Sequence, residues 1–281
     1  MRVLAIILAE TRSHELTWEN FKTNVLDELG ADLAVCAGQD LGLGQGPDAP
    51  GQDDPFFKNA KYVWTYPEQP RTDDGWADAF TNEVCGGNDD WKILLKLKDQ
   101  LFGGLGGGHK GSAGILMFFR WFLRKNLIES GALNEYDYFI VTRSDYYWDS
   151  PHMRLFLDDQ DSIYLPEGES YGGISDRHTV IPRKHVLKAL DVCYRLANHP
   201  GKTFDAMRTH NAWNIEKYLK FHFVAEGLFD HVKWFPRNVY AVRSSTAQTR
   251  WAEGYFEPEV NMIVKYQSEY ELVKRSRICT H

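Results

Sequence analysis

The sequence predicts an α/β fold in which helices flank a mostly parallel central sheet. The first observation is the order of elements at the start of the chain, where two apolar runs of strand length enclose a segment with helical spacing. This β-α-β order is the signature of a parallel sheet. The second observation is that Val3–Leu8 is apolar without interruption, which is typical of a strand covered on both faces.

The opening elements follow from their local patterns. After the strand Val3–Leu8, residues 14–29 carry apolar side chains at helical spacing, and Gly30 ends that helix. The run Ala31–Ala37 is the second strand. Residues 38–56 are dense in glycine, proline and aspartate, which predicts a loop that is a candidate lid or variable insert.

The rest of the chain continues to alternate strand and helix patterns without an internal repeat or a linker, so we expect one domain. In chain order, the expected elements are a strand at 61–65, an irregular stretch to 90, helices at 91–102 and 113–129, strands at 138–141, 162–165 and 179–181, helices at 183–197 and 211–220, and a tail of short strands and loops from 231.

Composition and charge exclude some classes of function. Hydrophobic residues make up 43% of the chain and charged residues 25%, as in an ordinary globular protein. The net charge of −7 argues against a general nucleic-acid binder, which would show a basic face. A phosphate group is therefore expected to be held locally, by a few arginines, a helix N-terminus or a metal ion. The 14% aromatic share suits sugar or base stacking, although most rings should lie in the core.

Cysteine usage and the apolar segments indicate where the protein works. The four cysteines are scattered without zinc-ligand or redox spacing, which fits a reducing compartment. The apolar N-terminal run is followed at once by polar residues and has no cleavage site, so it predicts a strand rather than a signal peptide. The longest apolar block, at 113–119, is far short of the ~20 residues of a membrane span. We expect a soluble, cytoplasmic protein.

Polar residues follow the first strand. Ala9, Thr11 and Arg12 lie where this strand leaves the sheet. In doubly wound sheets, ligands bind outside the carboxyl ends of the strands, so these positions are candidates for ligand contacts. Arg12 is expected to pair either with a phosphate or with a surface carboxylate.

A second polar pair ends the apolar strand at Tyr138–Val141. In the segment YDYFIVTRSDYYWD, Arg143 and Asp145 are two residues apart, and such residues point the same way on an extended chain. They can form a plain salt bridge. They can equally hold a diphosphate, the arginine by charge-assisted hydrogen bonds and the aspartate through a divalent metal.

A glycine-rich loop precedes the helix at 113–129. Gly106, Gly108 and Gly111 satisfy the pattern G-x-G-x-x-G, and Ser112 can cap the helix that follows. Lys110 and Ser112 are therefore minor candidates for phosphate binding. A dinucleotide-binding loop must follow a strand directly, whereas this one follows a helix, so a flexible connection is the alternative interpretation.

A second glycine-containing segment runs from Gly172 to His178. Its two adjacent glycines permit a close backbone approach, and Asp176 stands beside Arg177 and His178. Such a cluster fits a general base or the recognition of sugar hydroxyls. A carboxylate that caps the next segment is the alternative.

Taken in order, these segments resemble a GT-A-type glycosyltransferase with a Rossmann-like sheet. The resemblance rests on MRVLAIILAETR, YDYFIVTRSDYYW, GGISDRHTVIPRKHVLKAL and NAWNIEKYLKFHF. Similar enzymes occur in microbial polysaccharide pathways and in large algal viruses (chloroviruses). The chain departs from the commoner Asp-x-Asp motif, because Arg143 stands where the first aspartate would be.

The resemblance implies a hexosyl- or pentosyltransferase. It would move a sugar from a nucleoside-diphosphate sugar, with UDP-sugar as the expected donor, to an oligosaccharide or glycan acceptor. It also implies a single domain over residues 1–281, with a nucleotide-sugar-binding half at 1–150 and an acceptor-binding half at 151–281. A viral enzyme of this kind would work in the host cytoplasm.

The resemblance also assigns roles to residues. Asp145 would bind Mn²⁺ or Mg²⁺, although Arg143 can take over part of the charge neutralisation, which leaves strict metal dependence open. Asp176 would be the general base of an inverting transfer; a retaining transfer is the alternative mechanism. The alternative bases are Glu167, Glu169 and Asp205. The other expected contacts are Ala9, Thr11, Arg12, Lys110, Ser112, Arg143, Ser144 and Arg243 for the nucleotide sugar, and Tyr147, Trp148, Arg177 and His178 for the acceptor.

Two further classes of function are alternatives to the transferase. A carbohydrate- or nucleotide-binding protein without turnover fits the aromatic content and the acidic pI equally well. A metal-dependent phosphoesterase that uses Asp145 would need further clustered carboxylates or histidines, which the sequence does not show.

Overall fold

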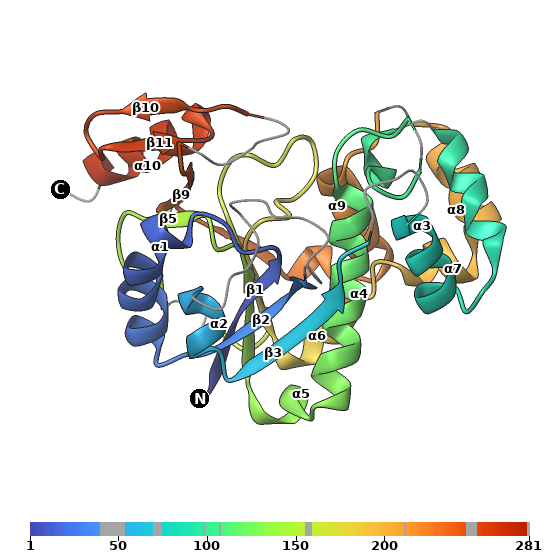
Figure 1. The fold of residues 1–281 in the computed structure, drawn as a ribbon, viewed down its shortest axis with the longest axis horizontal. Helices are drawn as coiled ribbons and strands as arrows, with labels where there is room; N and C mark the ends of the chain where they lie inside the picture. Colours follow the sequence, from blue (N-terminus) through green and yellow to red (C-terminus); the bar gives the residue numbers. More distant parts are fainter. Residues whose placement is uncertain are drawn as a thin grey trace.

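The computed structural model describes residues 1–39, 54–69, 75–97, 99–106, 108–154, 159–210, 212–245 and 252–279. Within these ranges the chain forms a seven-stranded sheet with helices on both faces and a separate four-stranded sheet (Figure 1). The expected α/β fold with helices around a mostly parallel sheet is confirmed. Most of the loop expected at 38–56 lies outside the described residues.

The large sheet has the strand order β3-β2-β1-β4-β7-β6-β8. Four neighbouring pairs are parallel, and β7 alone runs antiparallel to its two neighbours. The carboxyl ends of β1 and β4 therefore lie side by side, with Ile7 opposite Thr142. The bounds are β1 Val3–Ala9, β2 Asp32–Gln39, β3 Tyr62–Pro67, β4 Tyr138–Thr142, β6 Ile163–Pro166, β7 Thr179–Pro182 and β8 Val232–Phe235.

The two faces of this sheet are covered by different helices, which explains the uninterrupted apolar run of β1. Leu4, Ile6 and Leu8 pack in one core with α4 (Ala113–Glu129) and α6 (Arg183–Leu190). Their neighbours in the chain pack in a second core with α1 (His14–Phe21) and α2 (Pro55–Asn59). Alternate side chains of a strand face opposite sides, so both sets must be apolar.

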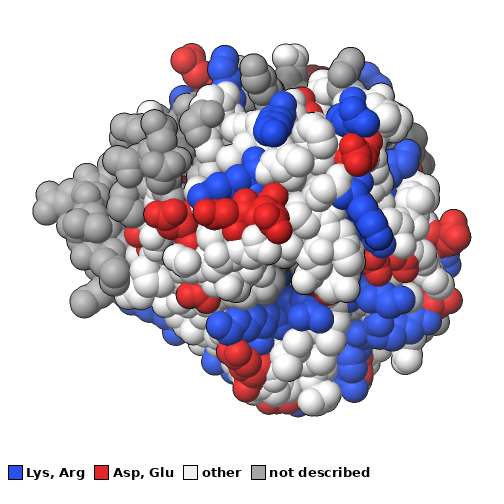
Figure 2. All heavy atoms as spheres, turned by 90° about the vertical axis from the view of Figure 1, so that its right-hand side faces the viewer, with Lys and Arg blue, Asp and Glu red and all other residues white. Residues whose placement is uncertain are grey.

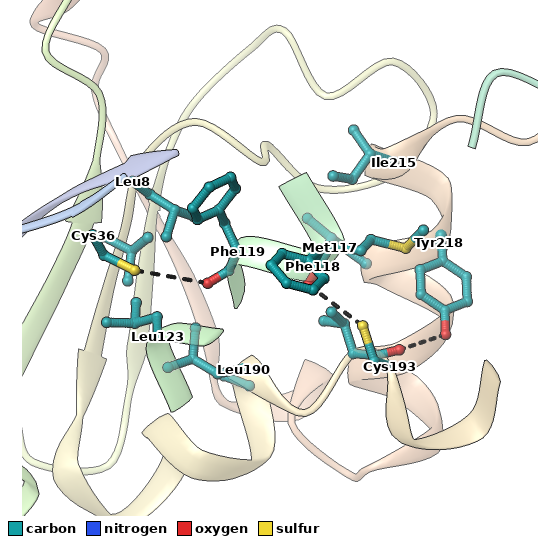
Figure 3. Close-up of a cluster of buried hydrophobic side chains, with 14 of the residues drawn as sticks. Leu8, Cys36, Met117, Phe118, Phe119, Leu123, Leu190, Cys193, Ile215 and Tyr218 are labelled. Carbon is teal, nitrogen blue, oxygen red and sulfur yellow. Dashed lines mark hydrogen bonds between the residues drawn. The ribbon is translucent and has the colours of Figure 1, made fainter. Parts of the chain in front are cut away.

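Two buried thiols belong to the first of these cores (Figure 3). The Sγ of Cys36 lies 4.0 Å from the carbonyl oxygen of Phe119, and the Sγ of Cys193 lies 3.4 Å from that of Met117. Burial raises the pKa of both thiols well above the ordinary value. These cysteines are therefore packing residues of the core.

The second sheet begins directly after β4. Its order is β10-β11-β9-β5, with bounds β5 Tyr146–Trp148, β9 Val239–Arg243, β10 Tyr255–Glu257 and β11 Met262–Val264. Only residues 143–145 separate β4 from β5, so they form the junction between the two sheets. The helix α10 (Gln267–Cys279) packs against β9 and corrects the expectation of a tail made only of strands and loops.

Several helices differ from the expected ones because local capping decides where they begin. The side chain of Asn214 accepts a hydrogen bond from the backbone N–H of Lys217, so α9 begins at Ile215 rather than near 211. Pro200 similarly starts a short helix of its own. The remaining helical bounds are α3 Gly75–Ala79, α5 Ala132–Glu135, α7 Tyr194–Asn198, α8 Pro200–Met207 and α9 Ile215–Ala225, with π-helical turns at Lys22–Asp27 and Phe80–Val84 and 3₁₀ turns at Asp89–Leu97, Gln100–Phe102 and Phe229–His231.

The described helices and the surface charges concern two classes of partner, membranes and nucleic acids. None of the described helices combines the length and the apolar character that a bilayer crossing requires. On the face shown in Figure 2, the described Lys and Arg side chains are interspersed with Asp and Glu side chains. That face therefore carries charges of both signs.

A buried carboxylate ties the second sheet to the loop that precedes β7. Glu269 of α10 is fully buried, and its Oε1 accepts hydrogen bonds from Arg177 Nη1 at 2.6 Å and Arg237 Nη1 at 3.3 Å. Its other oxygen accepts the backbone N–H of Ala241 in β9 at 2.9 Å. One side chain thus fixes α10, β9 and Arg177 relative to one another.

The substitution Glu269→Gln is expected to destabilise the protein strongly. It keeps the shape of the side chain but leaves two buried guanidinium groups without their counter-charge, which costs about 3–5 kcal/mol in comparable buried pairs. Urea unfolding measures the change in the free energy of unfolding. The control Glu271→Gln on the same helix should change it by no more than about 0.5 kcal/mol. Equal effects of the two substitutions would contradict the importance of this network.

Candidate functional site

A cavity of about 310 Å³ lies at the carboxyl ends of β1 and β4. This is the position at which doubly wound sheets bind their ligands. Its walls come from both halves of the chain. They comprise the ends of β1 and β4, the junction at 143–145, the first turns of α4 and α9, residues 171–177, and the connection between β11 and α10.

Hydrogen bonds of Ser144 connect the segments that follow β1 and β4 at the cavity. Its hydroxyl accepts the backbone N–H of Arg12 at 2.7 Å and lies 3.1 Å from the carbonyl oxygen of Arg12. Its own carbonyl accepts a hydrogen bond from the hydroxyl of Thr17 at 2.7 Å. Ala9 takes a positive φ of 74° here, a conformation that is uncommon for residues other than glycine. The segments after β1 and β4 are thereby held in one arrangement.

The pair formed by Arg143 and Asp145 is a bidentate salt bridge on the cavity wall. Arg143 Nε and Nη2 donate to the two carboxylate oxygens of Asp145 at 2.7 and 2.6 Å. The Nζ of Lys265 lies 3.7 Å from Oδ2 of Asp145. Burial by itself raises the pKa of Asp145, but the charges of Arg143 and Lys265 outweigh it and hold that pKa well below its ordinary range. Asp145 is therefore a fully ionised carboxylate at neutral pH.

Positive charge exceeds negative charge in the cavity. The pKa of Lys265 is lowered to about 8, first by burial and then by the charges of Arg143 and Arg12, while Asp145 acts in the opposite direction. Such crowding of cations suits a cavity that receives an anion carrying about two negative charges. The cavity is lined by six cationic side chains, Arg12, Lys110, Arg120, Arg143, Arg177 and Lys265. It is also lined by four acidic side chains, Glu10, Asp145, Asp176 and Glu216.

A pair of carboxylates from two different elements also faces the cavity. Asp176 comes from the loop before β7, and Glu216 comes from the first turn of α9. Burial, and after it the negative charge of Asp176, raises the pKa of Glu216 to about 7, while Arg177 and Arg120 act in the opposite direction. Arg120 also donates to the carbonyl oxygen of Asp176 at 2.6 Å. A carboxylate of this kind can accept a proton at neutral pH.

Gly173 allows the loop of Asp176 to approach α9. A Cβ at this position would lie 1.9 Å from the carbonyl oxygen of Glu216, which no side chain permits. The adjacent N–H of Ile174 donates to that same oxygen at 3.1 Å. The close backbone approach expected from the two glycines is confirmed, and it is what brings Asp176 beside Glu216.

Most of the expected donor-site residues line this cavity. The structure brings Arg143, Ser144 and Asp145 together with the end of β1 and with the start of α4. Their expected roles stay predictions. The expected residues found there are Ala9, Arg12, Lys110, Ser112, Arg143, Ser144, Asp145, Asp176 and Arg177.

Trp148 and His178 lie in the core instead, which corrects their expected contact with the acceptor. Trp148 is 1% exposed and packs against the rings of His152 and His178, with centroids 5.0 and 5.3 Å apart. His178 is fully buried, with Nε2 3.2 Å from Nε2 of His152 and Nδ1 3.0 Å from the hydroxyl of Thr142. The reason is that β5 pairs with β9, which turns Trp148 into the interior.

Three more expected contacts lie away from the cavity lining. Thr11 is buried, with 4% of its surface exposed. Tyr147 packs against Tyr240, with ring centroids 5.7 Å apart, in the core of the second sheet. Arg243 ends β9 and does not belong to the lining residues. We do not assign these side chains to ligand binding.

The alternative bases named from the sequence also lie outside the lining. Glu167 and Glu169 do not line the cavity. Asp205 is exposed on α8, where it pairs with Arg208 at 2.9 Å. Glu216 and Lys265, in contrast, were not expected from the sequence. One feature of the sequence points to Glu216: it follows the capping residue Asn214 and therefore lies in the first turn of a helix.

The donor set does not fit the expected Mn²⁺ or Mg²⁺ at Asp145. Both oxygens of its carboxylate already accept hydrogen bonds from Arg143, and Lys265 is the next cation. Glu10 pairs with Arg12, and Asp176 lies 3.8 Å from Arg177. In the part of the chain that the structure describes, a group of three potential ligands occurs at Asp161, His185 and His231, none of which lines the cavity.

Similarity to known proteins is found at the level of structure, and it is low. No protein-family model and no curated protein matches the chain. Among solved structures, the chain is similar to one described as the crystal structure of a glycosyltransferase involved in the glycosylation of the major capsid of PBCV-1. The match covers 84% of this chain and 82% of that chain, with 8% sequence identity and a TM-score of 0.39. The function therefore has to be derived from the side chains of the cavity.

The substitution Gly173→Ala is expected to separate the two carboxylates and to destabilise the fold. The added methyl group would meet backbone atoms of α9, which cannot swing aside as a side chain would. Overpacking of this kind costs about 1–3 kcal/mol. Thermal unfolding should show a lower melting temperature for Gly173→Ala. The control Gly201→Ala in α8 has open space around its Cβ and should be neutral or slightly stabilising. A melting temperature of Gly173→Ala equal to that of the control would contradict the steric argument.

Proposed function

We propose that the protein is a glycosyltransferase that moves a sugar from a nucleoside-diphosphate sugar to a hydroxyl group of a glycan acceptor. One observation carries this proposal: a single cavity holds both an excess of two positive charges and a buried carboxylate with a pKa near 7. The first feature suits a diphosphate leaving group, and the second suits the deprotonation of a hydroxyl. UDP-sugar is the first candidate donor.

The cationic side chains near Asp145 would hold the diphosphate. Arg12, Arg143 and Lys265 can each form charge-assisted hydrogen bonds to phosphate oxygens. Lys110 and Ser112 add donors at the start of α4, where backbone N–H groups also favour an anion. As the bond to the sugar breaks, negative charge grows on the diphosphate, and these fixed cations stabilise it without reorganising. The nucleoside would lie at the end of β1.

The carboxylate pair would activate the acceptor. The hydroxyl proton passes to the carboxylate of Glu216, the hydroxyl oxygen forms a bond to the anomeric carbon, and the diphosphate leaves with the electron pair of the broken bond. This single displacement inverts the anomeric centre. The sequence prediction gives the role of base to Asp176. Glu216 is the better-suited proton acceptor because Asp176 helps to raise its pKa into the neutral range.

Arg177 would couple the two parts of the site. Its charge opposes the rise in the pKa of Glu216 and also acts on Lys265. Its position is fixed from outside the cavity by Glu269, at 2.6 Å. Arg177 would therefore stand between the diphosphate and the acceptor, within reach of the transferred sugar.

A screen of sugar nucleotides tests the proposed function. Thermal unfolding is followed with UDP-, GDP- and CDP-sugars, each with Mn²⁺ and with EDTA, and the release of nucleoside diphosphate is measured in parallel. A ligand that binds only the native state stabilises it by about 2.7 kcal/mol at a hundredfold excess over Kd, so one donor class should raise the melting temperature. The same donor should be hydrolysed slowly.

Two other results would contradict the transferase. Binding without hydrolysis, and without transfer to any glycan tested, would favour a nucleotide-binding protein without turnover. If no sugar nucleotide raised the melting temperature under either condition, the proposed donor site would be wrong.

Substitutions of the two carboxylates are expected to have different effects on the pH profile. Glu216→Gln should lower the transfer rate by about 10²–10⁴-fold while leaving the donor-induced rise in melting temperature in place. In the wild type the rate should fall as the pH drops below about 7, because Glu216 becomes protonated. Asp176→Asn removes the neighbouring negative charge, lowers the pKa of Glu216, and should shift this fall to lower pH.

The control for these measurements is Glu226→Gln, at the end of the same helix and outside the cavity, which should retain the wild-type rate and pH profile. Wild-type activity of Glu216→Gln together with an inactive Asp176→Asn would return the role of base to Asp176.

A further inference from the structure

We infer that Lys265, together with Arg143, takes the place of a divalent metal ion in this cavity, so that the diphosphate of the donor is bound and neutralised without Mn²⁺ or Mg²⁺. The inference rests on the proposed function, since it concerns how the same site holds a nucleoside diphosphate. It assigns Lys265 a role in binding that neither a motif nor its position in the sequence indicates.

The carboxylate of Asp145 is already neutralised by Arg143. Asp145 is 3% exposed, and Arg143 donates to both of its oxygens in a fork at 2.7 and 2.6 Å. Each oxygen keeps a second lone pair, but a metal ion bound there would lie beside the guanidinium of Arg143 and near the ammonium of Lys265 inside a buried site. The single negative charge of Asp145 would then have to balance two protein cations and a divalent ion. The geometry therefore disfavours a metal at this carboxylate.

Lys265 also lies beside this carboxylate. Its backbone N–H donates to the carbonyl oxygen of Ala241 at 2.8 Å, which fixes it where β11 leads into α10. Its side chain is 6% exposed, and its Nζ lies 3.7 Å from Oδ2 of Asp145. That separation is too long for a hydrogen bond. Within the described residues no closer acceptor contacts this ammonium group, so its three N–H donors can turn to a ligand.

The cavity as a whole carries an excess of positive charge. Its lining has two more cationic than acidic side chains, which matches a diphosphate that carries about two negative charges. Asp145 is surrounded by the charges of Arg143, Lys265 and Arg12. A divalent ion added there would raise the excess to four positive charges and would be repelled by three neighbouring cations. The diphosphate, in contrast, is balanced by the side chains alone.

Arg143 and Lys265 therefore have different tasks. Arg143 neutralises Asp145. Lys265, from the connection between β11 and α10, presents its ammonium group to the diphosphate. The carboxylate then serves to position two cations rather than to coordinate an ion. The diphosphate binds to cations that the fold supplies, and the departure of the diphosphate from the sugar needs no metal.

Titration calorimetry of the full chain tests the inference. Wild-type protein is dialysed against EDTA and titrated with UDP, GDP and CDP, and the titrations are repeated with Mn²⁺. For the nucleotide that binds, the affinity in EDTA should lie within about threefold of that in Mn²⁺. Lys265→Met should weaken binding at least about tenfold in both conditions, because a charge-assisted contact to phosphate is lost. Lys265→Arg keeps the charge and should recover most of the affinity.

The matched control is Lys220→Met on the exposed side of α9, which should bind like the wild type. Should Lys265→Met unfold, the comparison of EDTA with Mn²⁺ on wild-type protein still decides the question. Binding that occurs only with Mn²⁺ would overturn the inference and leave the proposed function intact. Binding in EDTA that Lys265→Met does not weaken would overturn the role of Lys265. If no nucleotide binds in either condition, the proposed function itself is wrong.

Discussion

The buried carboxylate of Glu269 is the interaction on which the arrangement of the cavity depends. It accepts hydrogen bonds from Arg177, from Arg237 and from the backbone of β9, all in the interior. Through Arg177 it fixes the loop that carries Asp176. Through β9 and α10 it fixes the short connection that carries Lys265. Asp176 and Lys265, which have different proposed tasks, are thus both positioned by Glu269, which does not itself line the cavity.

The sequence predicts the large sheet well because its strands carry local signals. The uninterrupted apolar run of β1 and the β-α-β order determine the first three elements, and the helix expected at 113–129 is α4 with the same bounds. The second sheet and α10 were not foreseen in this form. Among the residues of α10 whose side chains the structure describes, Tyr270 and Val273 are the buried apolar ones, and the ion pairs of Glu269 help to fix the position of this helix. Such long-range pairing leaves no periodicity in the sequence.

The difference between local signals and long-range pairing also separates the site residues that the sequence predicts from those that it misses. The rule that ligands lie beyond the strand ends placed Arg12, Arg143 and Asp145 at one cavity, as found. The expected contact of Trp148 with the acceptor is wrong. Trp148 faces the core because β5 pairs with β9, some ninety residues later in the chain. Lys265 is more than a hundred residues from its neighbour Asp145 and belongs to no motif. Residues of this kind can be found only once the topology is known.

An Arg-x-Asp pair differs electrostatically from an Asp-x-Asp pair. Two carboxylates that point the same way repel each other and need a cation between them, so such a pair is a metal site before any ligand arrives. An arginine and an aspartate at the same spacing neutralise each other, as Arg143 and Asp145 do here. The attraction for an anion must then come from elsewhere in the fold. In this cavity Arg12 at the end of β1 and Lys265 before α10 supply further positive charge, so the electrostatics around the pair depend on residues from other segments of the chain.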